Sequence, residues 1–445
     1  MRDERILELI EQKKYIDLKK ELSDMNEVDI SEIFEELDHS TSLLVFRILP
    51  KDVAVEVFAH FSAEKQAEII NSVSDRELKF ILGELFFDDM IDLIEEMPAN
   101  IVSKILSNST HEERVLINQF LKYPYHSAGS LMTIEYVELK KNMTVKEALD
   151  HIKEIGLSKE TIYTCYVTDK NKKLRGIVSL RNLVISDFDE CIEDLLLEEI
   201  IFVETHDDQE TVANIFKKYG FMALPVVDKE QRLTGIITFD DIMDVIEEEA
   251  TEDFQRMAAM MPSDEAYLDS SVISLAKQRI PWLMILMIGA TLTGRIITKF
   301  EDVLSAVVVL TAFIPMLMDT GGNSGSQSST LVIRGLALGE VETKDIWRVL
   351  WKEFRISLLV GISLATVNFA KNMLFDRVGL TVSITVSTTV ATTVLLAKMV
   401  GGTLPLIAKK LKLDPAIMAG PLITTIVDAL VLMVYFGIAS ALLIK

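Results

Sequence analysis

Negative charge and apolar segments are divided unevenly along this chain, and the division limits what it can fold into. Residues 1–280 carry a formal charge balance of −27, whereas residues 281–445 carry +4 and consist largely of apolar stretches. A bilayer needs roughly 20 apolar residues per helix, and several of these stretches approach that length. We therefore expect a strongly acidic soluble body joined to an α-helical membrane body. A field this negative repels nucleic acid and attracts cations, although solubility alone would also explain it.

The first 125 residues have the pattern of short amphipathic helices, as in ILPKDVAVEVFAHF and AEKQAEIINSV. Ser74 with Glu77, and Thr110 with Glu113, have the spacing of capping boxes and mark helix starts. The short period predicts an all-α superhelical domain over residues 1–125. Asp88 and Asp92 share one helix face, where a bound cation or plain solvation would screen them.

Residues 126–250 contain an internal repeat. CYVTDKNKKLRGIVSLRNLV matches PVVDKEQRLTGIITFDDIMD, with Gly176 and Gly235 in equivalent places. Each copy has a helix, a strand, a turn, a second strand and a helix, which predicts two α/β modules packed as a pair. These motifs resemble a tandem pair of cystathionine-β-synthase (CBS) domains. Such pairs commonly bind adenine nucleotides, so the resemblance makes ATP a candidate ligand and implies a regulatory role.

The segment after the second module is unusually acidic. Residues 240–253 hold eight acids and no Lys or Arg. On a helix, Asp241, Asp244 and Glu248 form one stripe, with Glu249 and Glu252 nearby. Carboxylate oxygens are the ligands of hard divalent cations, so we expect a cation sensor here rather than a merely acidic linker.

Five apolar spans are expected in residues 281–445. The first is 281–300, the second starts at Val303, the third near Ile356, the fourth around Leu380, and the fifth runs from Ala416 to Leu443. Lys and Arg concentrate in the connections after spans two and four, which places those connections and the soluble body in the cytoplasm and the C-terminus outside. The N-terminus lacks the apolar core of a cleaved signal peptide, so we expect none, and the expected membrane is the plasma or inner membrane.

The second span runs into a polar stretch, DTGGNSGSQSST. Its residues 321–330 cannot face lipid, and Pro315 with the glycines suggests a broken helix lining a cavity. Close helix packing explains the glycines as well, but it explains Asn323 and Gln327 less well. In span five, Asp428 lies in the middle of an apolar run, where a carboxylate marks a functional site unless Arg295 or Lys398 neutralises it. Asp319 is the only other acid within the expected spans.

The sequence contains no motif for a cysteine metal site or for catalysis. The two cysteines, Cys165 and Cys191, have no metal-ligand spacing and indicate a reducing setting. No nucleophile–base arrangement, phosphate loop or HExxH motif occurs, so we do not expect an enzyme.

The domain order and three local motifs resemble the MgtE family of magnesium channels over essentially the whole chain. The motifs are PMLMDTGGNSGSQS in span two, LDPAIMAGP before span five, and TTIVDA within it. The resemblance implies a homodimer with a pore between the two fifth spans, and a plug helix at about Ser263–Lys277 within a connecting region 251–280. Gly220 and Gly420 replace an acid and an asparagine that this family pattern leads us to expect.

The resemblance also implies roles for individual residues. It makes Asp428 the selectivity carboxylate and Asp414 an acid at the inner mouth, and the pore candidates are completed by Gly321, Gly322, Asn323, Gln327, Thr424 and Thr425. The Mg²⁺ sensor candidates are Glu56, Asp88, Asp92, Asp208, Glu210, Asp241, Asp244, Glu248, Glu249 and Glu252.

The expected function is magnesium uptake through a channel that cytoplasmic Mg²⁺ closes. Two alternatives remain open at this stage: a membrane-anchored nucleotide sensor that transports nothing, and a transporter coupled to a proton or sodium gradient. Mg, Mn, Co and Ni all accept oxygen-rich sites, so the sequence leaves the choice among them open.

Overall fold

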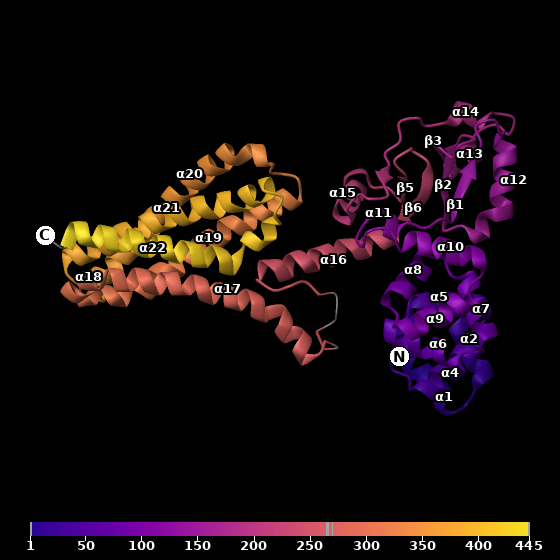
Figure 1. Cartoon of the computed structure of the whole chain (residues 1–445), viewed down its shortest axis with the longest axis horizontal. Helices are drawn as coiled ribbons and strands as arrows, with labels where there is room; N and C mark the ends of the chain where they lie inside the picture. Colours follow the sequence, from indigo (N-terminus) through magenta and orange to yellow (C-terminus); the bar gives the residue numbers. More distant parts are fainter. Residues whose placement is uncertain (1, 264–266, 269, 444–445) are drawn as a thin grey trace. The chain divides into compact units, whose positions relative to one another are not determined.

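The computed structural model describes residues 2–263, 267–268 and 270–443, which divide into two units, residues 1–246 and 247–445. The first unit begins with ten stacked short helices (Figure 1). They are α1 (Arg2–Glu11), α2 (Tyr15–Ser23), α3 (Glu27–Glu35), α4 (His39–Ile48), α5 (Lys51–Ala59), α6 (Ala63–Ser72), α7 (Asp75–Glu84), α8 (Phe87–Glu96), α9 (Ala99–Asn108) and α10 (His111–Phe120). Both predicted capping boxes are present, at the starts of α7 and α10. The all-α N-terminal domain is thus confirmed.

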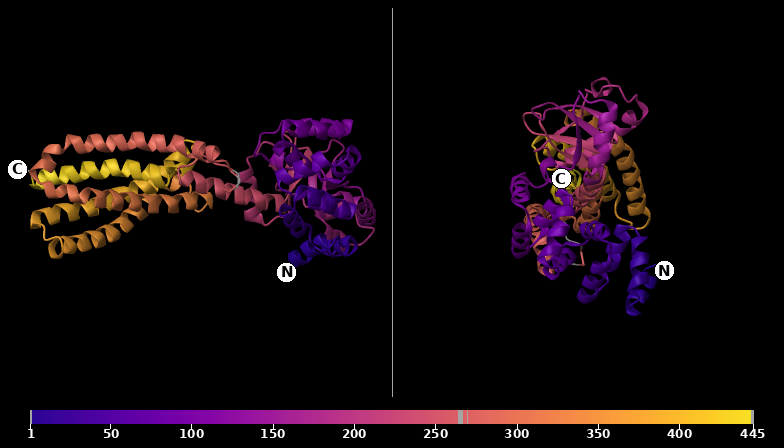
Figure 2. Two further views of the ribbon diagram at one scale, coloured as in Figure 1. Left: turned by 90° about the horizontal axis from the view of Figure 1, so that it is seen from below. Right: turned by 90° about the vertical axis from the view of Figure 1, so that its right-hand side faces the viewer.

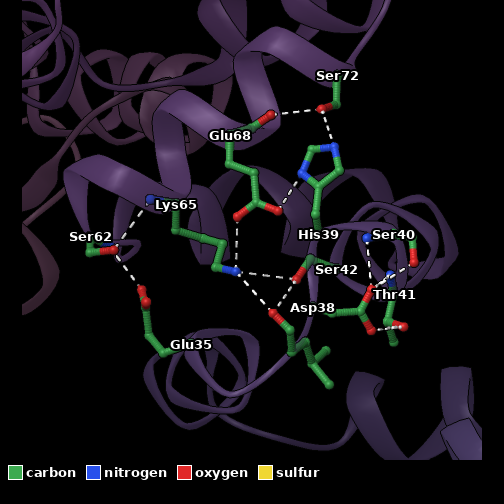
Figure 3. A network of polar contacts seen from close by, with 11 residues as sticks. Glu35, Asp38, His39, Ser40, Thr41, Ser42, Ser62, Lys65, Glu68 and Ser72 are labelled. Atoms are coloured by element: carbon green, nitrogen blue, oxygen red, sulfur yellow. Dashed lines mark hydrogen bonds and ion pairs between the residues drawn. The ribbon is translucent and has the colours of Figure 1, made fainter.

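A buried lysine joins the helices of this domain. The ammonium of Lys65 lies 3.0 Å from a carboxylate oxygen of Glu68 and donates to the Ser42 hydroxyl at 3.3 Å and the Leu37 carbonyl at 3.2 Å (Figure 3). Glu68 also contacts the His39 ring. Burial alone would raise the pKa of Glu68, but its contacts with Lys65 and His39 outweigh burial and lower it. The network satisfies a charge that would otherwise be costly to bury.

The two repeat copies form the predicted pair of α/β modules. In the first, β1 (Tyr136–Leu139) is parallel to β2 (Thr161–Thr168), and β2 is antiparallel to β3 (Leu174–Ser179). In the second, β4 (Val203–Glu204), β5 (Ala223–Val227) and β6 (Leu233–Thr238) have the same order and directions. The accompanying helices are α11 (Ala128–Leu131), α12 (Val145–Ile155), η1 (Gly156–Ser158), α13 (Leu180–Ile185), α14 (Ile192–Leu195), α15 (Gln209–Tyr219) and α16 (Phe239–Met257).

The paired glycines have a common structural cause. A Cβ at Gly176 would lie 2.3 Å from the Leu196 side chain, and a Cβ at Gly235 would lie 2.5 Å from the Thr133 carbonyl oxygen. In each module a separate segment of chain crosses the last strand at this point, so only glycine fits.

The second unit consists mainly of long helices lying side by side (Figure 2). They are α17 (Val272–Lys299), α18 (Glu301–Ala306), η2 (Val308–Phe313), α19 (Ile314–Ala337), η3 (Thr343–Asp345), α20 (Ile346–Leu374), α21 (Leu380–Lys410), η4 (Pro415–Met418) and α22 (Gly420–Leu443). Among the described residues, four helices are long and apolar enough to cross a membrane: α17, α20 with the preceding η3, α21 and α22. Helix α19 is a fifth long helix, with 24 residues, but its polar stretch keeps it outside that set. The count of five membrane spans therefore stays a prediction.

Three details of the predicted spans are wrong. The chain is broken before Ile314, at η2, and the polar residues 321–330 are helical, because intrahelical hydrogen bonds satisfy their backbone without any unwinding. The third span begins at Ile346 rather than near Ile356, so most of the basic residues assigned to a connection lie within α19 and α20. The fifth helix starts at Gly420 rather than Ala416, after the turn η4.

The expected plug segment, Ser263–Lys277, falls partly outside the described residues, at 264–266 and 269. Of its described part, only Val272–Lys277 is helical, as the first turns of α17. The acidic stretch, by contrast, belongs to the continuous helix α16.

Candidate functional site

Helix α19 presents two different faces. Its glycines face the bundle: a Cβ at Gly321 would lie 2.7 Å from the Val431 side chain, and a Cβ at Gly322 would lie 2.9 Å from that of Thr424. Since both neighbours belong to α22, these glycines bring the backbones of α19 and α22 together. Close helix packing, one of the two explanations that the sequence left open, therefore accounts for the glycines.

The opposite face of α19 carries a stripe of exposed polar side chains. Asp319, Asn323 and Gln327 are spaced by four residues and are all exposed in this chain, although most of the surrounding helices are apolar. Close helix packing does not account for this stripe, because its three side chains remain exposed in their own chain.

Asp428 is half-buried near the middle of α22. Within the part of the chain that the structure describes, its carboxylate has no hydrogen-bond partner or ion pair, and Asp319 is its charged neighbour. Neither expected counter-ion pairs with it: Arg295 is exposed on α17, and Lys398 donates to Ser328 at 3.4 Å. The carboxylate is therefore not neutralised inside this chain.

The two threonines before Asp428 use their hydroxyls locally. Thr424 and Thr425 donate to the Pro421 carbonyl at 2.8 and 2.9 Å. Thr424 packs on Gly322 of α19, and Thr425 packs on Gly289 of α17. The structure thus places both at helix contacts.

Asp414 lies in the connection between α21 and η4. One of its carboxylate oxygens accepts from the Ala416 amide at 2.8 Å, and the other contacts the guanidinium of Arg256. The same guanidinium contacts Glu252, so Arg256 pairs with two acids, one predicted as a sensor ligand and the other as an acid at the inner mouth of the pore.

A second group of acids gathers in the first unit around α8 and the start of α16. Burial, followed by the negative charge of Asp241, raises the pKa of Asp89 to about 6, that of Asp92 to about 7 and that of Glu160 to about 8. The pKa of Asp88 is raised well above its usual value for the same two reasons. Asp241 accepts from the Thr238 hydroxyl at 2.5 Å, and burial raises its own pKa to about 6.

The sequence predicted only part of this group. It identified Asp88, Asp92, Asp241 and Glu56, whose charge acts on Asp89, but it missed Asp89 and Glu160. Glu160 precedes β2, far along the chain from α8, and only its acidity could have drawn attention to it. No three His, Cys, Asp or Glu side chains in the described ranges are arranged to hold a metal ion, so this group is a largely buried acidic cluster without preformed coordination.

The remaining sensor candidates lie elsewhere. Asp208 caps α15 by accepting from the Glu210 amide at 3.1 Å. Asp244, Glu248 and Glu249 continue along α16. Gly220, which stands where an acid was expected, ends α15 with φ +65°, a conformation that favours glycine. At Gly420, a Cβ would lie 3.0 Å from the Met257 carbonyl oxygen.

The chain resembles known proteins over nearly its full length. Residues 314–438 match the MgtE family model, described as a divalent cation transporter; residues 25–126 match the MgtE intracellular N domain, and residues 128–187 and 192–248 match the CBS domain. It is 36% identical over 438 residues to the magnesium transporter MgtE of Thermus thermophilus, covering 96% of this chain and 95% of that one. It is 34% identical over 443 residues to that of Bacillus subtilis, covering 98% and 96%.

Two solved structures match the first unit. The soluble part of a magnesium transporter has a TM-score of 0.53 and 30% identity, covering 56% of this chain and 98% of that one. The cytosolic domain of the Mg²⁺ channel MgtE in complex with ATP has a TM-score of 0.51 and 34% identity, covering 54% and 98%.

The fold and these matches define a membrane transporter for divalent cations, with a helical N-terminal domain and a CBS pair. The chain belongs to the MgtE family of magnesium transporters, which are not enzymes. Membership in this family excludes the sensor that transports nothing.

Proposed function

We propose that this protein is a homodimeric Mg²⁺ channel that carries magnesium into the cell and is closed by cytoplasmic Mg²⁺. The observation that carries the proposal is the exposed polar stripe of α19, together with Asp428, whose carboxylate has no hydrogen-bond or ion-pair partner among the described residues. Polar side chains at membrane depth are stable only against protein or water, so a second copy and a water-filled path between the copies would satisfy them.

The selectivity follows from the chemistry of the ion. Magnesium loses its water reluctantly, so a pore can recognise the hydrated ion by accepting hydrogen bonds from its waters. Two Asp428 carboxylates across a dimer axis would supply a charge of −2 for an ion of +2, which is strong enough to exclude anions and weak enough for release. Asn323 and Gln327 would offer further oxygen acceptors along the path, and Asp414 a carboxylate at its inner mouth.

Gating would follow from repulsion among the acids. Without cations, burial first and the negative charge of Asp241 second raise the pKa values of the α8 group, so its carboxylates are both poorly solvated and mutually repelling when ionised. Cytoplasmic Mg²⁺ would relieve that repulsion and favour a compact, closed state, with Asp208, Glu210, Asp244, Glu248 and Glu249 as further ligands. Moving such a gate from mostly open to mostly closed takes about 5.5 kcal/mol of differential binding, which several weak sites supply together.

The orientation has the soluble domains in the cytoplasm and the C-terminus outside the cell membrane. In support, Lys409 of α21 donates to the Leu336 carbonyl of α19 at 3.3 Å, so the basic ends of these helices lie together. Lys and Arg favour the cytoplasmic side of a membrane. The ATP-bound relative makes ATP a candidate ligand of the CBS pair here.

The test is Mg²⁺ flux into liposomes that contain the purified protein, at a series of internal Mg²⁺ concentrations. We expect downhill entry that falls as internal Mg²⁺ rises. Absence of flux at every internal concentration would overturn the proposal, and dependence on an imposed proton or sodium gradient would replace the channel with a coupled transporter. Parallel measurements with Mn²⁺, Co²⁺ and Ni²⁺ determine the selectivity.

A further inference from the structure

Three membrane helices meet at a buried chain of polar groups. The Ser328 hydroxyl of α19 donates to a carboxylate oxygen of Glu353 on α20 at 2.6 Å, and it accepts from the ammonium of Lys398 on α21 at 3.4 Å. The three residues are only 1%, 6% and 5% exposed, respectively. The serine thus connects an acid and a base that form no direct ion pair.

The buried charges of Glu353 and Lys398 stabilise each other through Ser328. A buried carboxylate or ammonium is costly to remove from water, and the cost is offset only when an opposite charge and hydrogen bonds are close by. Loss of one charge leaves the other unpaired at membrane depth. Loss of both leaves only neutral groups there, including the Ser328 hydroxyl, which are less costly to bury.

The helix backbones around these three polar residues are tightly packed. A Cβ at Gly402 of α21 would lie 2.9 Å from the Cγ of Glu353, and a Cβ at Gly401 would lie 2.3 Å from the Gly325 carbonyl oxygen of α19. The three polar residues therefore lie where glycines of α21 allow close contact with both α19 and α20.

The same segment of α19 supports the helix that carries Asp428. Gly325, one turn before Ser328, packs against α22, where a Cβ would lie 3.3 Å from the Val427 side chain. The next residue, Ser329, donates to the Met418 carbonyl at 2.6 Å, just before α22 begins. A shift of α19 at Ser328 would therefore move the neighbour of Asp428.

We propose that Glu353 and Lys398 are positioning residues for transport: their paired charges, joined by Ser328, hold α19 in the position that sets the ion affinity at Asp428. The proposal rests on the proposed function for the role of Asp428. The pair acts through α19 and touches no ion.

The experiment compares Glu353→Gln, Lys398→Met and the double variant in proteoliposomes. Mg²⁺ flux is measured against external Mg²⁺ and normalised to the amount of monodisperse protein. We expect each single change to raise the half-saturating Mg²⁺ concentration by about fivefold or more, and the double variant to return within about twofold of the original value. The exposed pair Lys371 and Asp376, 2.6 Å apart, is the matched control, and Lys371→Met with Asp376→Asn should change nothing.

The outcomes separate the possible failures. If the single variants lower only the yield or the maximal flux, or if the double variant combines both defects, the positioning role is wrong. If neither single variant folds, Ser328→Ala decides, because it removes only the connecting hydroxyl: a rise of about threefold in half-saturation supports the role, and no change overturns it. Asp428→Asn is measured alongside, since an unchanged flux there would defeat the proposed function instead.

Discussion

The guanidinium of Arg256, at the end of α16, contacts the carboxylate of Asp414, which lies 158 residues further along the chain. It also contacts Glu252, one turn earlier on the same helix. In the absence of a divalent cation, this arginine is the counter-ion of two acids proposed to bind one. It therefore does part of what a bound cation would do, since it holds the end of α16 against the connection that precedes η4 and α22.

Replacing Arg256 by Gln should make that contact dependent on cations. Without the guanidinium, Glu252 and Asp414 repel each other, so we expect the flux at low internal Mg²⁺ to rise about two- to fivefold and to return to the original level at high internal Mg²⁺. The expected rise in flux is small because partly exposed ion pairs contribute only a modest free energy. Liposome flux at both internal concentrations measures it.

Arg232→Gln is the control for that change, because Arg232 forms an exposed pair with Glu230 in the second CBS module. An equal rise in both variants, or no rise in Arg256→Gln, would contradict the role given to Arg256.

Neutralising Asp428 should abolish most transport. Asp428→Asn keeps the size of the side chain and removes a charge that no residue in the described chain neutralises, so we expect Mg²⁺ flux to fall at least about tenfold, the effect of losing a charge-assisted interaction. Asp302→Asn, an exposed acid in the short helix α18, serves as the control. Undiminished flux in Asp428→Asn would show that the ion does not pass this carboxylate.

The acids around α8 predict a pH dependence in the cation-free protein. Their folded pKa values, about 6 for Asp89 and Asp241, about 7 for Asp92 and about 8 for Glu160, lie above the ordinary values of carboxyl groups. The folded state consequently holds more protons than the unfolded state between about pH 4 and pH 8, so stability falls as pH rises through that window. Amide hydrogen exchange in α8, corrected for its intrinsic pH dependence, should be slower at pH 5.5 than at pH 8 when a chelator is present.

Asp241→Asn should flatten that profile, because the Asp241 charge contributes to the raised pKa values of Asp88, Asp89, Asp92 and Glu160. Added Mg²⁺ should slow exchange at pH 8 in the original protein and less so in the variant. Asp169→Asn, which alters a partly exposed carboxylate paired with Arg175 at 2.6 Å in the first CBS module, should leave the α8 profile as it was. A profile insensitive to both Asp241 and Mg²⁺ would contradict the sensor assignment.

The close approach of α19 and α21 predicts opposite effects for two glycine substitutions. Gly401→Ala would place a Cβ 2.3 Å from the Gly325 carbonyl oxygen, so we expect a loss of about 1–3 kcal/mol, seen as a lower melting temperature in detergent. Gly437→Ala, in α22, meets no described atom within 4 Å and should be neutral or slightly stabilising, since alanine favours helix. Equal shifts would show that the contact at Gly401 relaxes freely.

The features predicted well from sequence are those with a local cause. The repeated order of helices and strands, with equivalent glycines, predicted both CBS modules, and the spacing of Ser74 with Glu77 predicted a helix start that the structure confirms. The MgtE resemblance predicted the family. Each depends on residues within one element or on a motif several residues long.

The features missed depend on neighbours that are distant in sequence. The basic residues around Glu353 indicated a connection between spans, so the third span was predicted to start too far along the chain. As a result, Glu353 was not recognised as a buried acid of that helix. The polar stretch of α19 suggested an unwound chain, because nothing in the sequence showed that its glycines pack on α22. Glu160 joins the α8 group only through the tertiary fold.

The polarity of α19 has a consequence for how the protein is made. Membrane insertion machinery recognises helices by their hydrophobicity, and α19 is the long helix of this bundle that falls short by that measure. The helices α17, α20, α21 and α22 are apolar enough to enter the bilayer one at a time during synthesis, whereas α19 needs partners for its polar groups. Its serines hydrogen-bond to α20, α21 and η4, and its glycines pack against α21 and α22, all of which leave the ribosome later. If α19 crosses the membrane, its insertion would therefore have to wait until α22 has been made, and a chain truncated before α22 would leave its polar groups without these contacts.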